Sequence, residues 1–549
     1  MERSALKIPK NKQIFLYPSL NKFNFYLEKN KTLFKQYSFK ISNQPFQMIR
    51  ESNRKKIVQK ANQFNQQYNI FYEKKINSYH QNIKIIQTGH QPTFFHPGVW
   101  IKNIFLDKII KSSPNYNQLG LNIILDNDIY REPSFYLPVK FDSGDIKLEK
   151  INFLYVPLKI PFEETSLPTL AQVKQFSREV INKIIPLKNK NMLANFIDFS
   201  KCLEKSLSLC CQKANETNFG EFLGIARRYS EYNINPAYHE LSFSKICDSN
   251  EFLSFFLEIA KNIDFFCSIY NGNLDIYRKH HKIRNRVNPS PNLLIEENLI
   301  ELPFWIWKKG DIRRKFYTLK ENNKLFFYNE VYGKFFFFEN NNLKTCLKLK
   351  RLLKDNQIKI RPRALLLTLY NRLFISDLFI HGIGGAKYDE ITNNIIKDFF
   401  HVEPPLFYTI SATLLLDLKS FYTSTDSSIP ILRKKLRDLS FNPENNIADF
   451  ALLQHDKTFV QQLIKTKKEL INEIKKGLTL DEKKSVSNKI LKINLQIKEK
   501  LRPLEIELKE KLDSIEKYEK QSEVYTFREF PFCFFSAKEV TKLFSLYPS

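Results

Sequence analysis

Residues 378–390 read Leu-Phe-Ile-His-Gly-Ile-Gly-Gly-Ala-Lys-Tyr-Asp-Glu, an apolar run that breaks into glycines and continues into acidic residues. This order predicts a strand, a tight loop and a helix. Asp389 and Glu390 would fall in the first turn of the helix, where acidic side chains favour the positive end of the helix dipole. Apolar residues at helical spacing would form its buried face: Ile391, Ile395, Ile396, Phe399 and Phe400.

The glycines make this corner a candidate binding loop. Glycine lets a backbone approach a ligand closely, and a strand–glycine–helix corner exposes N–H groups that suit a phosphate or a carboxylate. The alternative to a binding loop is a structural turn. In that case His381 would only form hydrogen bonds with backbone groups. The residues of this corner that we expect at a substrate or nucleotide site are His381, Gly382, Gly384, Gly385, Tyr388 and Asp389.

A second unit of the same kind lies upstream, in residues 81–128. Residues 83–86 form a short apolar strand that leads into Thr88-Gly89-His90-Gln91, and residues 101–109 carry isoleucine and phenylalanine at helical spacing. Residues 121–125 form a second apolar strand, which ends before Asp126-Asn127-Asp128. In open parallel sheets, ligands bind outside the carboxyl ends of the strands. The sequence therefore predicts that the loops near residues 90 and 384 line one cleft.

Three residues of this unit are candidates for catalysis. His90 follows a glycine at a strand end and could assist proton transfer, or it could simply be satisfied by the backbone. Its spacing from His96 does not suit zinc. In an extended strand, Asp126 and Asp128 would point to the same side, where they could bind Mg²⁺ or take a proton from an amine. Capping of the next helix is the alternative.

Both loops, in this order, resemble the BshC family, the cysteine-adding enzymes of bacillithiol biosynthesis. Members carry a Thr-Gly-Gln-Gln loop that leads through small residues and Gly-Pro into a helix, to which residues 88–98 are similar. Later family motifs correspond to Arg361-Pro362, Gly384-Gly385 and Pro404-Pro405. The first loop, with His90-Gln91-Pro92, also resembles WbqC-like proteins.

The resemblance implies a Rossmann-like parallel sheet with helical insertions and a C-terminal antiparallel coiled-coil arm. It implies a carbon–nitrogen ligase that adds cysteine, or another amino acid, to an amino-sugar acceptor, with ATP or ADP and Mg²⁺ as cofactors and a homodimer formed through the coiled coil. In this interpretation Arg361 and the two loops hold the acceptor or a phosphate. The residues of the first loop in that role are Thr88, Gly89 and Gln91.

The charge of the chain gives little support to a nucleic-acid partner. The net charge is +28, but only 20 of the 86 basic residues are arginine, which leaves 66 lysines. Arginine supplies the bidentate and stacking contacts typical of specific nucleic-acid sites, so the lysine excess favours compositional bias. The densest basic cluster, residues 278–286, could hold phosphates or an acidic sugar, or could be a solvated loop.

The cysteines and the hydropathy suggest a cytoplasmic protein. None of the seven cysteines forms a C-x-x-C pair, so neither a zinc framework nor a disulfide set is expected. The first residues lack the apolar core of a signal peptide, and no run approaches the ~20 apolar residues of a membrane span.

The sequence divides into four regions. We expect a mainly helical region at 1–80, a core at 81–420 with insertions at about 130–350, a helical arm at 421–525, and a segment at 526–549 that packs on the core. In the insertion, residues 299–307, 326–328 and 335–338 are predicted strands. In the arm, Gly477 separates two helices, Thr479 caps the second, and Pro503 kinks or divides it.

A different class of function remains open. The chain could be a non-catalytic, dimeric protein that binds a nucleotide or, through its basic surface, a nucleic acid. The helical arm could pair with a second copy or pack against its own core.

Overall fold

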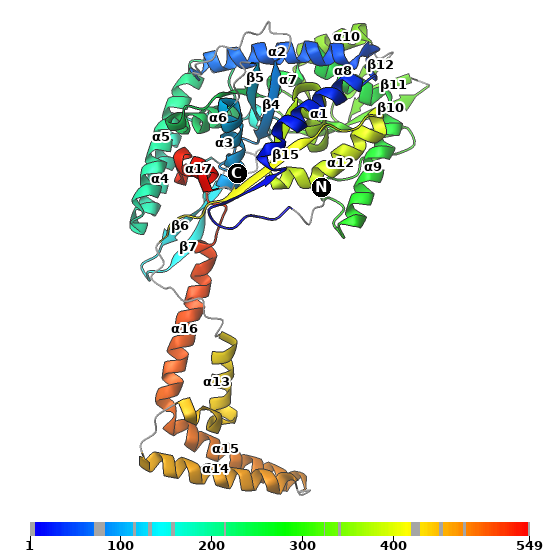
Figure 1. Cartoon of the computed structure of the whole chain (residues 1–549). Coiled ribbons are helices and arrows are strands. Elements are labelled where there is room, and N and C mark those ends of the chain that lie inside the picture. The colour runs from blue at the N-terminus through cyan, green and yellow to red at the C-terminus, as the bar shows by residue number, and fades with distance from the viewer. Residues whose placement is uncertain are drawn as a thin grey trace. The chain divides into compact units, whose positions relative to one another are not determined.

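The computed structural model forms two compact units (Figure 1). One unit contains residues 1–140, 148–416 and 528–549, and the other contains residues 141–147 and 417–527. The residues that the structure describes are 6–70, 83–112, 117–129, 134–154, 160–213, 216–322, 324–338, 342–418, 429–449, 454–475 and 479–546.

A six-stranded sheet forms the centre of the first unit, in the order β1-β15-β14-β4-β5-β8. Neighbouring strands are parallel, except that β1 runs antiparallel to β15. The prediction of an α/β fold with mostly parallel strands is therefore confirmed. The strands are β1 (Gln13–Tyr17), β4 (Lys84–His90), β5 (Gln118–Ile124), β8 (Tyr238–Ser242), β14 (Leu378–His381) and β15 (Phe407–Thr413). β1 comes from the region expected to be mainly helical, and β8 comes from the insertion.

The upstream unit folds as predicted. β4 is followed by helix α3 (Pro97–Ser112) and then by β5, which pairs with β4 from Lys84↔Gln118 to His90↔Ile124. The helix is buried on nearly every side, which explains its apolar sequence. Only Lys108, Lys111 and Ser112 are exposed in it.

The downstream unit also folds as strand and helix, with one correction. Helix α12 (Ile383–Phe400) begins directly after Gly382, so the expected glycine loop is a single N-cap residue plus the first helical turn. Asp389 and Glu390 consequently lie in the second turn, and the prediction that they start the helix is wrong. The predicted apolar face is buried at all five positions, which confirms it.

A second sheet packs into the same unit, built from the insertion and the strand after it. It has five antiparallel strands in the order β12-β11-β10-β9-β13. All three strands predicted within the insertion are present. The strands are β9 (Leu299–Lys308), β10 (Arg314–Glu321), β11 (Lys324–Asn329), β12 (Gly333–Phe338) and β13 (Ile358–Pro362).

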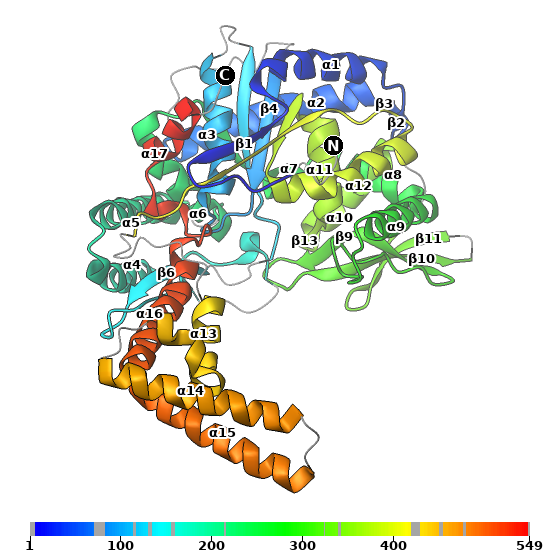
Figure 2. The same ribbon diagram turned by 60° about the horizontal axis from the view of Figure 1, so that its bottom comes forward.

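Helices surround both sheets, and in Figures 1 and 2 α3 and α12 lie to either side of β4. The N-terminal region contributes α1 (Phe23–Gln36) and α2 (Phe46–Gln67). The remaining helices of the unit are α4 (Leu170–Ile184), α5 (Lys190–Cys211), α6 (Phe219–Ser230), α7 (Ser244–Cys247), α8 (Asn250–Lys261), α9 (Ile263–His280), α10 (Leu343–Asp355), α11 (Ala364–Tyr370) and α17 (Ala537–Lys542). Two short hairpins complete it: β2 (Lys40–Ile41) with β3 (Gln44–Pro45), and β6 (Ser134–Lys140) with β7 (Ile146–Asn152).

The second unit consists mainly of helices α13 (Ile429–Phe441), α14 (Gln454–Lys475), α15 (Leu480–Lys500) and α16 (Arg502–Tyr525). Thr479 and Glu482 form a capping box at the start of α15, as predicted. The helix is interrupted between α15 and α16, next to Pro503, which was also predicted. Gly477, expected to separate two helices, lies outside the described residues. Buried leucines, isoleucines and one valine from the four helices form a common core.

Within the described ranges, no helix is both long and apolar enough to cross a membrane. All seven cysteines are free thiols.

Candidate functional site

The two β-α-β connections run in opposite directions across the central sheet. From β4 the chain passes through α3 to β5, whereas from β14 it passes through α12 to β15 on the other side. β4 and β14 are neighbours, so the strand order reverses between them. This is the position at which open α/β sheets bind ligands. We call the carboxyl edge formed by residues 88–91 and 381–385 the switch-point edge.

Strand register brings the two predicted loops together at this edge. Phe379 lies opposite Gln87, which places His381 level with Gly89. The Thr88 hydroxyl donates a hydrogen bond of 3.0 Å to the Ile380 carbonyl and links the strands. The prediction that the two segments share one edge of one sheet is confirmed. Thr88 is buried, and its hydroxyl already forms a hydrogen bond within the sheet.

Two helices start at this edge. The N-termini of α3 and α12 carry partial positive charge, and neither helix has an acidic residue in its first turn to neutralise it. Free N–H groups at a helix start suit phosphate or carboxylate oxygens. Pro97 has no N–H, and the N–H groups of Gly98 and Val99 already donate to His96, so of these two helices only α12 can offer them. The start of α12 therefore favours an anion at the switch-point edge.

Lys102 brings a charged side chain to the same place. It lies in α3, is 4% exposed, and donates a hydrogen bond of 2.6 Å from Nζ to the Gly89 carbonyl. Its Cδ would be 3.9 Å from a Cβ built on Gly382, so the side chain runs between the two loops. Burial lowers the pKa of Lys102 to about 7. A lysine with this pKa is present in both the charged and the neutral form at neutral pH.

His90 is held neutral beside this lysine. Its Nδ1 lies 3.0 Å from the Gln91 carbonyl, which fixes the proton on Nδ1 and leaves Nε2 as an acceptor. Burial, and next the charge of Lys102, lower the pKa of His90 to about 3. The imidazole stacks edge-on against Phe95 and remains partly exposed.

His381 belongs to a buried ionic group. Its Nε2 lies 2.6 Å from Oδ2 of Asp389, and the same carboxylate oxygen accepts a hydrogen bond of 2.8 Å from Arg372. Burial alone would raise the pKa of Asp389, but Arg372 and then His381 lower it below its ordinary value. Burial lowers the pKa of His381, and Asp389 offsets only part of this. The group fixes the orientation of the His381 ring.

The three glycines at the start of α12 have different structural roles. A Cβ on Gly385 would lie 2.8 Å from Nδ1 of His381, whereas a Cβ on Gly384 would meet nothing within 4 Å. None of the three glycines has a positive φ. Gly385 is therefore needed for the approach of the imidazole, and Gly382 serves as the N-cap of α12.

Gln91 and Asp128 connect the edge to the second sheet. The Gln91 side chain donates a hydrogen bond of 3.0 Å to Asp128, and Arg313 donates one of 2.8 Å to the other oxygen of the same carboxylate. The guanidinium groups of Arg313 and Arg363 lie 4.3 Å and 4.2 Å from the ring centre of Trp305. Trp305 is thus held between two cations.

The expectation that Asp126 and Asp128 act from one side of a strand is wrong. β5 ends at Ile124, so both residues lie in a turn. Asp126 is fully buried and accepts hydrogen bonds from the Ser244 N–H (2.9 Å), the Ser244 hydroxyl (2.5 Å) and the Asn218 amide (2.8 Å). Burial, helped by Glu163, raises the pKa of Asp126 to about 7. Asp126 organises the turn and does not reach the switch-point edge.

Two further predicted residues also lie elsewhere. Arg361 is in β13 of the second sheet, where Glu163 accepts two hydrogen bonds of 2.9 Å and Asp248 one of 3.0 Å. Its guanidinium is buried and occupied, so its role as a ligand contact is corrected to a structural one. Tyr388 is 42% exposed on α12, beside the buried Asp389.

The carboxylates do not fit the Mg²⁺ that the family resemblance implies. Asp126 and Asp128 face different partners and present no common position for a metal ion. The start of α12 and Lys102 do fit an anionic group.

Sequence reasoning missed Lys102 and Arg372. One signal was present for Lys102: it interrupts the apolar sequence of residues 99–106 and lies on a different face of the helix from Lys108 and Lys111. A lysine on an otherwise apolar face must lie at a polar site or a strand end. Arg372 gave no such signal.

Comparison with protein-family models and with curated proteins found no match to this chain.

Proposed function

We propose that the switch-point edge binds a small molecule with carboxylate groups and an amine, and that Lys102 accepts the proton of the amine when a carbon–nitrogen bond forms. The observation that carries this proposal is the position of Lys102, buried between the two loops with its pKa lowered to about 7.

The electrostatics of the edge support the binding of carboxylates. The start of α12, which has no acidic residue in its first turn, and one buried cation favour negative charge. The acceptor that the BshC-like resemblance implies is an amino sugar that carries malate, which has two carboxylates. The substrate class implied by the resemblance is therefore compatible with this edge.

The proton chemistry supports amide formation. An amine that attacks an acyl carbon must lose a proton, and a proton acceptor works best when its pKa lies near the working pH. Lys102 meets this condition, and Nε2 of His90 offers a second acceptor. Because a free carboxylate is a poor acyl donor, the donor amino acid must arrive in an activated form, for which the resemblance implies a nucleotide.

The His381–Asp389–Arg372 group acts as a positioning device in this proposal. It fixes the ring of His381 at the end of β14, next to the start of α12. The ring is packed by Phe379 and Phe407, so it cannot turn away.

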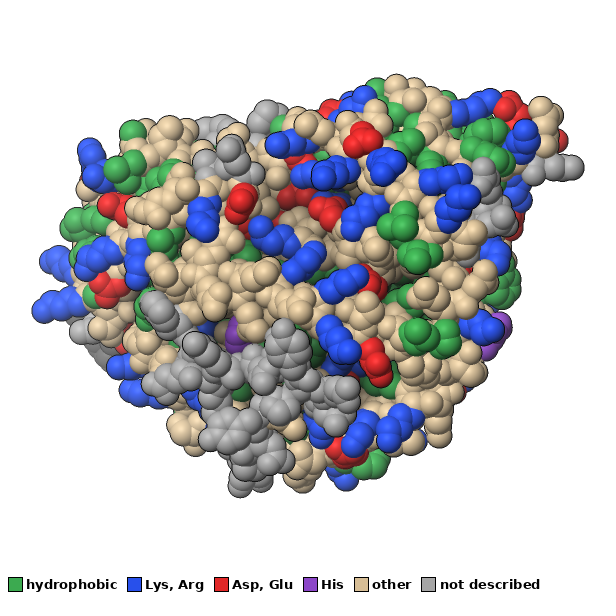
Figure 3. Space-filling model, turned by 90° about the horizontal axis from the view of Figure 1, so that it is seen from above, with side chains coloured by type: hydrophobic (Ala, Val, Ile, Leu, Met, Phe, Trp, Pro, Cys, Tyr) green, Lys and Arg blue, Asp and Glu red, His purple; other side chains and the backbone are tan. Residues whose placement is uncertain are grey.

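The face of the molecule shown in Figure 3 gives no separate support to the nucleic-acid alternative. On the face shown in Figure 3, lysine and arginine side chains are spread out, with aspartate and glutamate among them. A nucleic-acid interface is expected to gather basic side chains into a stripe or a patch.

Product formation tests the proposal. The purified chain is incubated with cysteine, ATP and the malate-bearing amino sugar, and the mixture is analysed by mass spectrometry. We expect a product in which one cysteinyl group has been added to the amine. Lys102→Met should abolish it, whereas Lys108→Met, an exposed lysine of the same helix, should leave it unchanged. If the folded wild type gives no such product, the reaction is wrong, and if Lys102→Met retains it, the role of Lys102 is wrong.

A further inference from the structure

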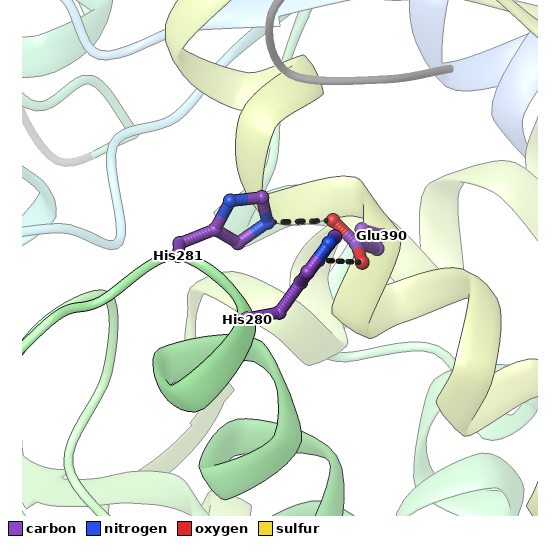
Figure 4. A group of neighbouring side chains, drawn as sticks. All are labelled: His280, His281 and Glu390. Atoms are coloured by element: carbon purple, nitrogen blue, oxygen red, sulfur yellow. Dashed lines mark hydrogen bonds and ion pairs between the residues drawn. The ribbon is translucent and has the colours of Figure 1, made fainter.

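Three potential metal ligands meet where α9 ends against α12 (Figure 4). His280 is the last residue of α9 and His281 its C-cap, while Glu390 lies in the second turn of α12. One ligand atom from each residue lies within 4.8 Å of the other two. Nε2 of His281 is 3.0 Å from Oε2 of Glu390, and Nδ1 of His280 is 3.7 Å from Oε1.

These separations suit a transition-metal ion. Zinc binds imidazole nitrogen and carboxylate oxygen at about 2.0–2.2 Å, so tetrahedral ligands are about 3.3 Å apart. The two separations between histidine nitrogen and carboxylate oxygen, 3.0 Å and 3.7 Å, lie on either side of this value, and the His280 side chain is exposed and can adjust toward an ion. Two imidazoles and one carboxylate are ligands that zinc, cobalt, nickel and copper accept.

Packing and hydrogen bonds fix the helices that carry the three side chains. The His281 side chain is only 10% exposed, and its ring lies 4.3 Å from that of Tyr277. α9 and α12 are joined further along by the hydrogen bond of 2.8 Å from Asn273 to Asp398 and by the contact of Phe266 with Phe399. The C-terminal end of a helix carries partial negative charge, which also favours a cation at this place.

We propose that His280, His281 and Glu390 bind one divalent transition-metal ion, of which zinc is the best match, with water in the remaining position. The ion would clamp the end of α9 to α12. Sequence reasoning did not find this group, because His281 and Glu390 are 109 residues apart. The proposal is independent of the reaction at the switch-point edge.

Metal titration tests the proposal. The untagged, full-length chain is stripped with chelator and titrated with Co²⁺, whose visible absorption reports four-coordinate nitrogen and oxygen ligation, and with Zn²⁺ by calorimetry. We expect one equivalent to bind and the melting temperature to rise with Zn²⁺. Glu390→Gln and His280→Ala should each weaken binding at least tenfold.

His401→Asn is the matched control. His401 is exposed at the other end of α12 and has a positive φ, which asparagine tolerates. It should bind metal as the wild type does. The His280 side chain is 71% exposed, so its replacement should leave the fold intact, as circular dichroism can verify. Absence of binding by the wild type, or equal binding by wild type, Glu390→Gln and His280→Ala, would overturn the site.

Discussion

Nζ of Lys102 lies 2.6 Å from the carbonyl oxygen of Gly89, at the end of the strand next to β14. In the described part of the chain no carboxylate pairs with this ammonium group, and its pKa is lowered by burial alone. A buried lysine without a counter-charge is costly. The presence of a lysine at this position, despite its cost to stability, supports a role for Lys102 in binding or proton transfer.

Replacement of Lys102 by methionine should make the protein more stable at pH 7. The folded state must keep a lysine whose pKa falls from 10.5 to about 7, which corresponds to a cost on the order of 4 kcal/mol. Between pH 7 and 10.5 the unfolded chain binds more protons at this position than the folded chain does, so the contribution of Lys102 to stability rises with pH.

Urea unfolding at pH 7 and pH 9 measures this effect. The advantage of Lys102→Met over the wild type should be largest at pH 7 and should shrink at pH 9. His90 and His381, the titratable groups facing Lys102, remain in both proteins. Their contributions to the difference in unfolding free energy therefore cancel to first order. An advantage that does not change between the two pH values would show that Lys102 keeps an ordinary pKa.

Gly385→Ala and Gly384→Ala should have opposite effects on stability. The new methyl group at position 385 would lie 2.8 Å from Nδ1 of His381, whose ring is packed by Phe379 and Phe407 and cannot give way. We expect a loss of about 1–3 kcal/mol. At position 384 there is open space, and alanine in a helix should raise stability by at most about 1 kcal/mol. Equal effects in thermal unfolding would contradict the close packing at His381.

Sequence periodicity was sufficient to find the upstream β-α-β unit and the strand and helix of the downstream unit, because the apolar runs of 83–86, 121–125 and 378–381 are short and their helices are strongly patterned. It could not show that β1 and β8 complete the sheet, since pairing between distant strands leaves no local signal. The same limit applies to the site. Glu390 meets two histidines at the end of α9, which lies far upstream in the sequence. Arg372 pairs with Asp389 across β14, a contact that no periodicity marks, and Arg361 follows a family-like motif yet pairs with Glu163.

Asp389→Asn should destabilise the chain strongly. Arg372 is 1% exposed and its partner carboxylate 2%, so loss of the negative charge leaves a buried guanidinium without its ion pair. The expected loss is about 3–5 kcal/mol in chemical unfolding. Tyr388→Phe, at the exposed neighbouring position, is the control and should unfold like the wild type. A loss below about 1 kcal/mol for Asp389→Asn would argue against a buried ionic group.

Asp126→Asn should destabilise the protein more than Asp128→Asn does, because only the carboxylate of Asp126 is buried. In Asp126→Asn the new amide nitrogen would face a donor, either Asn218 or Ser244, and we expect a loss of about 1–3 kcal/mol. The Asp128 side chain is 37% exposed, so loss of its pair with Arg313 should cost at most about 1 kcal/mol. Similar losses in guanidinium unfolding would mean that both carboxylates have the same role.

In the proposed function, a carboxylate-bearing small molecule binds at the switch-point edge with Lys102 at its centre. Calorimetric titration with malate at pH 6, where Lys102 is mostly charged, tests it without any assumption about the reaction. We predict binding to the wild type and to Lys108→Met with equal affinity, and at least tenfold weaker binding to Lys102→Met. Equal affinity of Lys102→Met and the wild type, or no binding to the wild type, would contradict the claim.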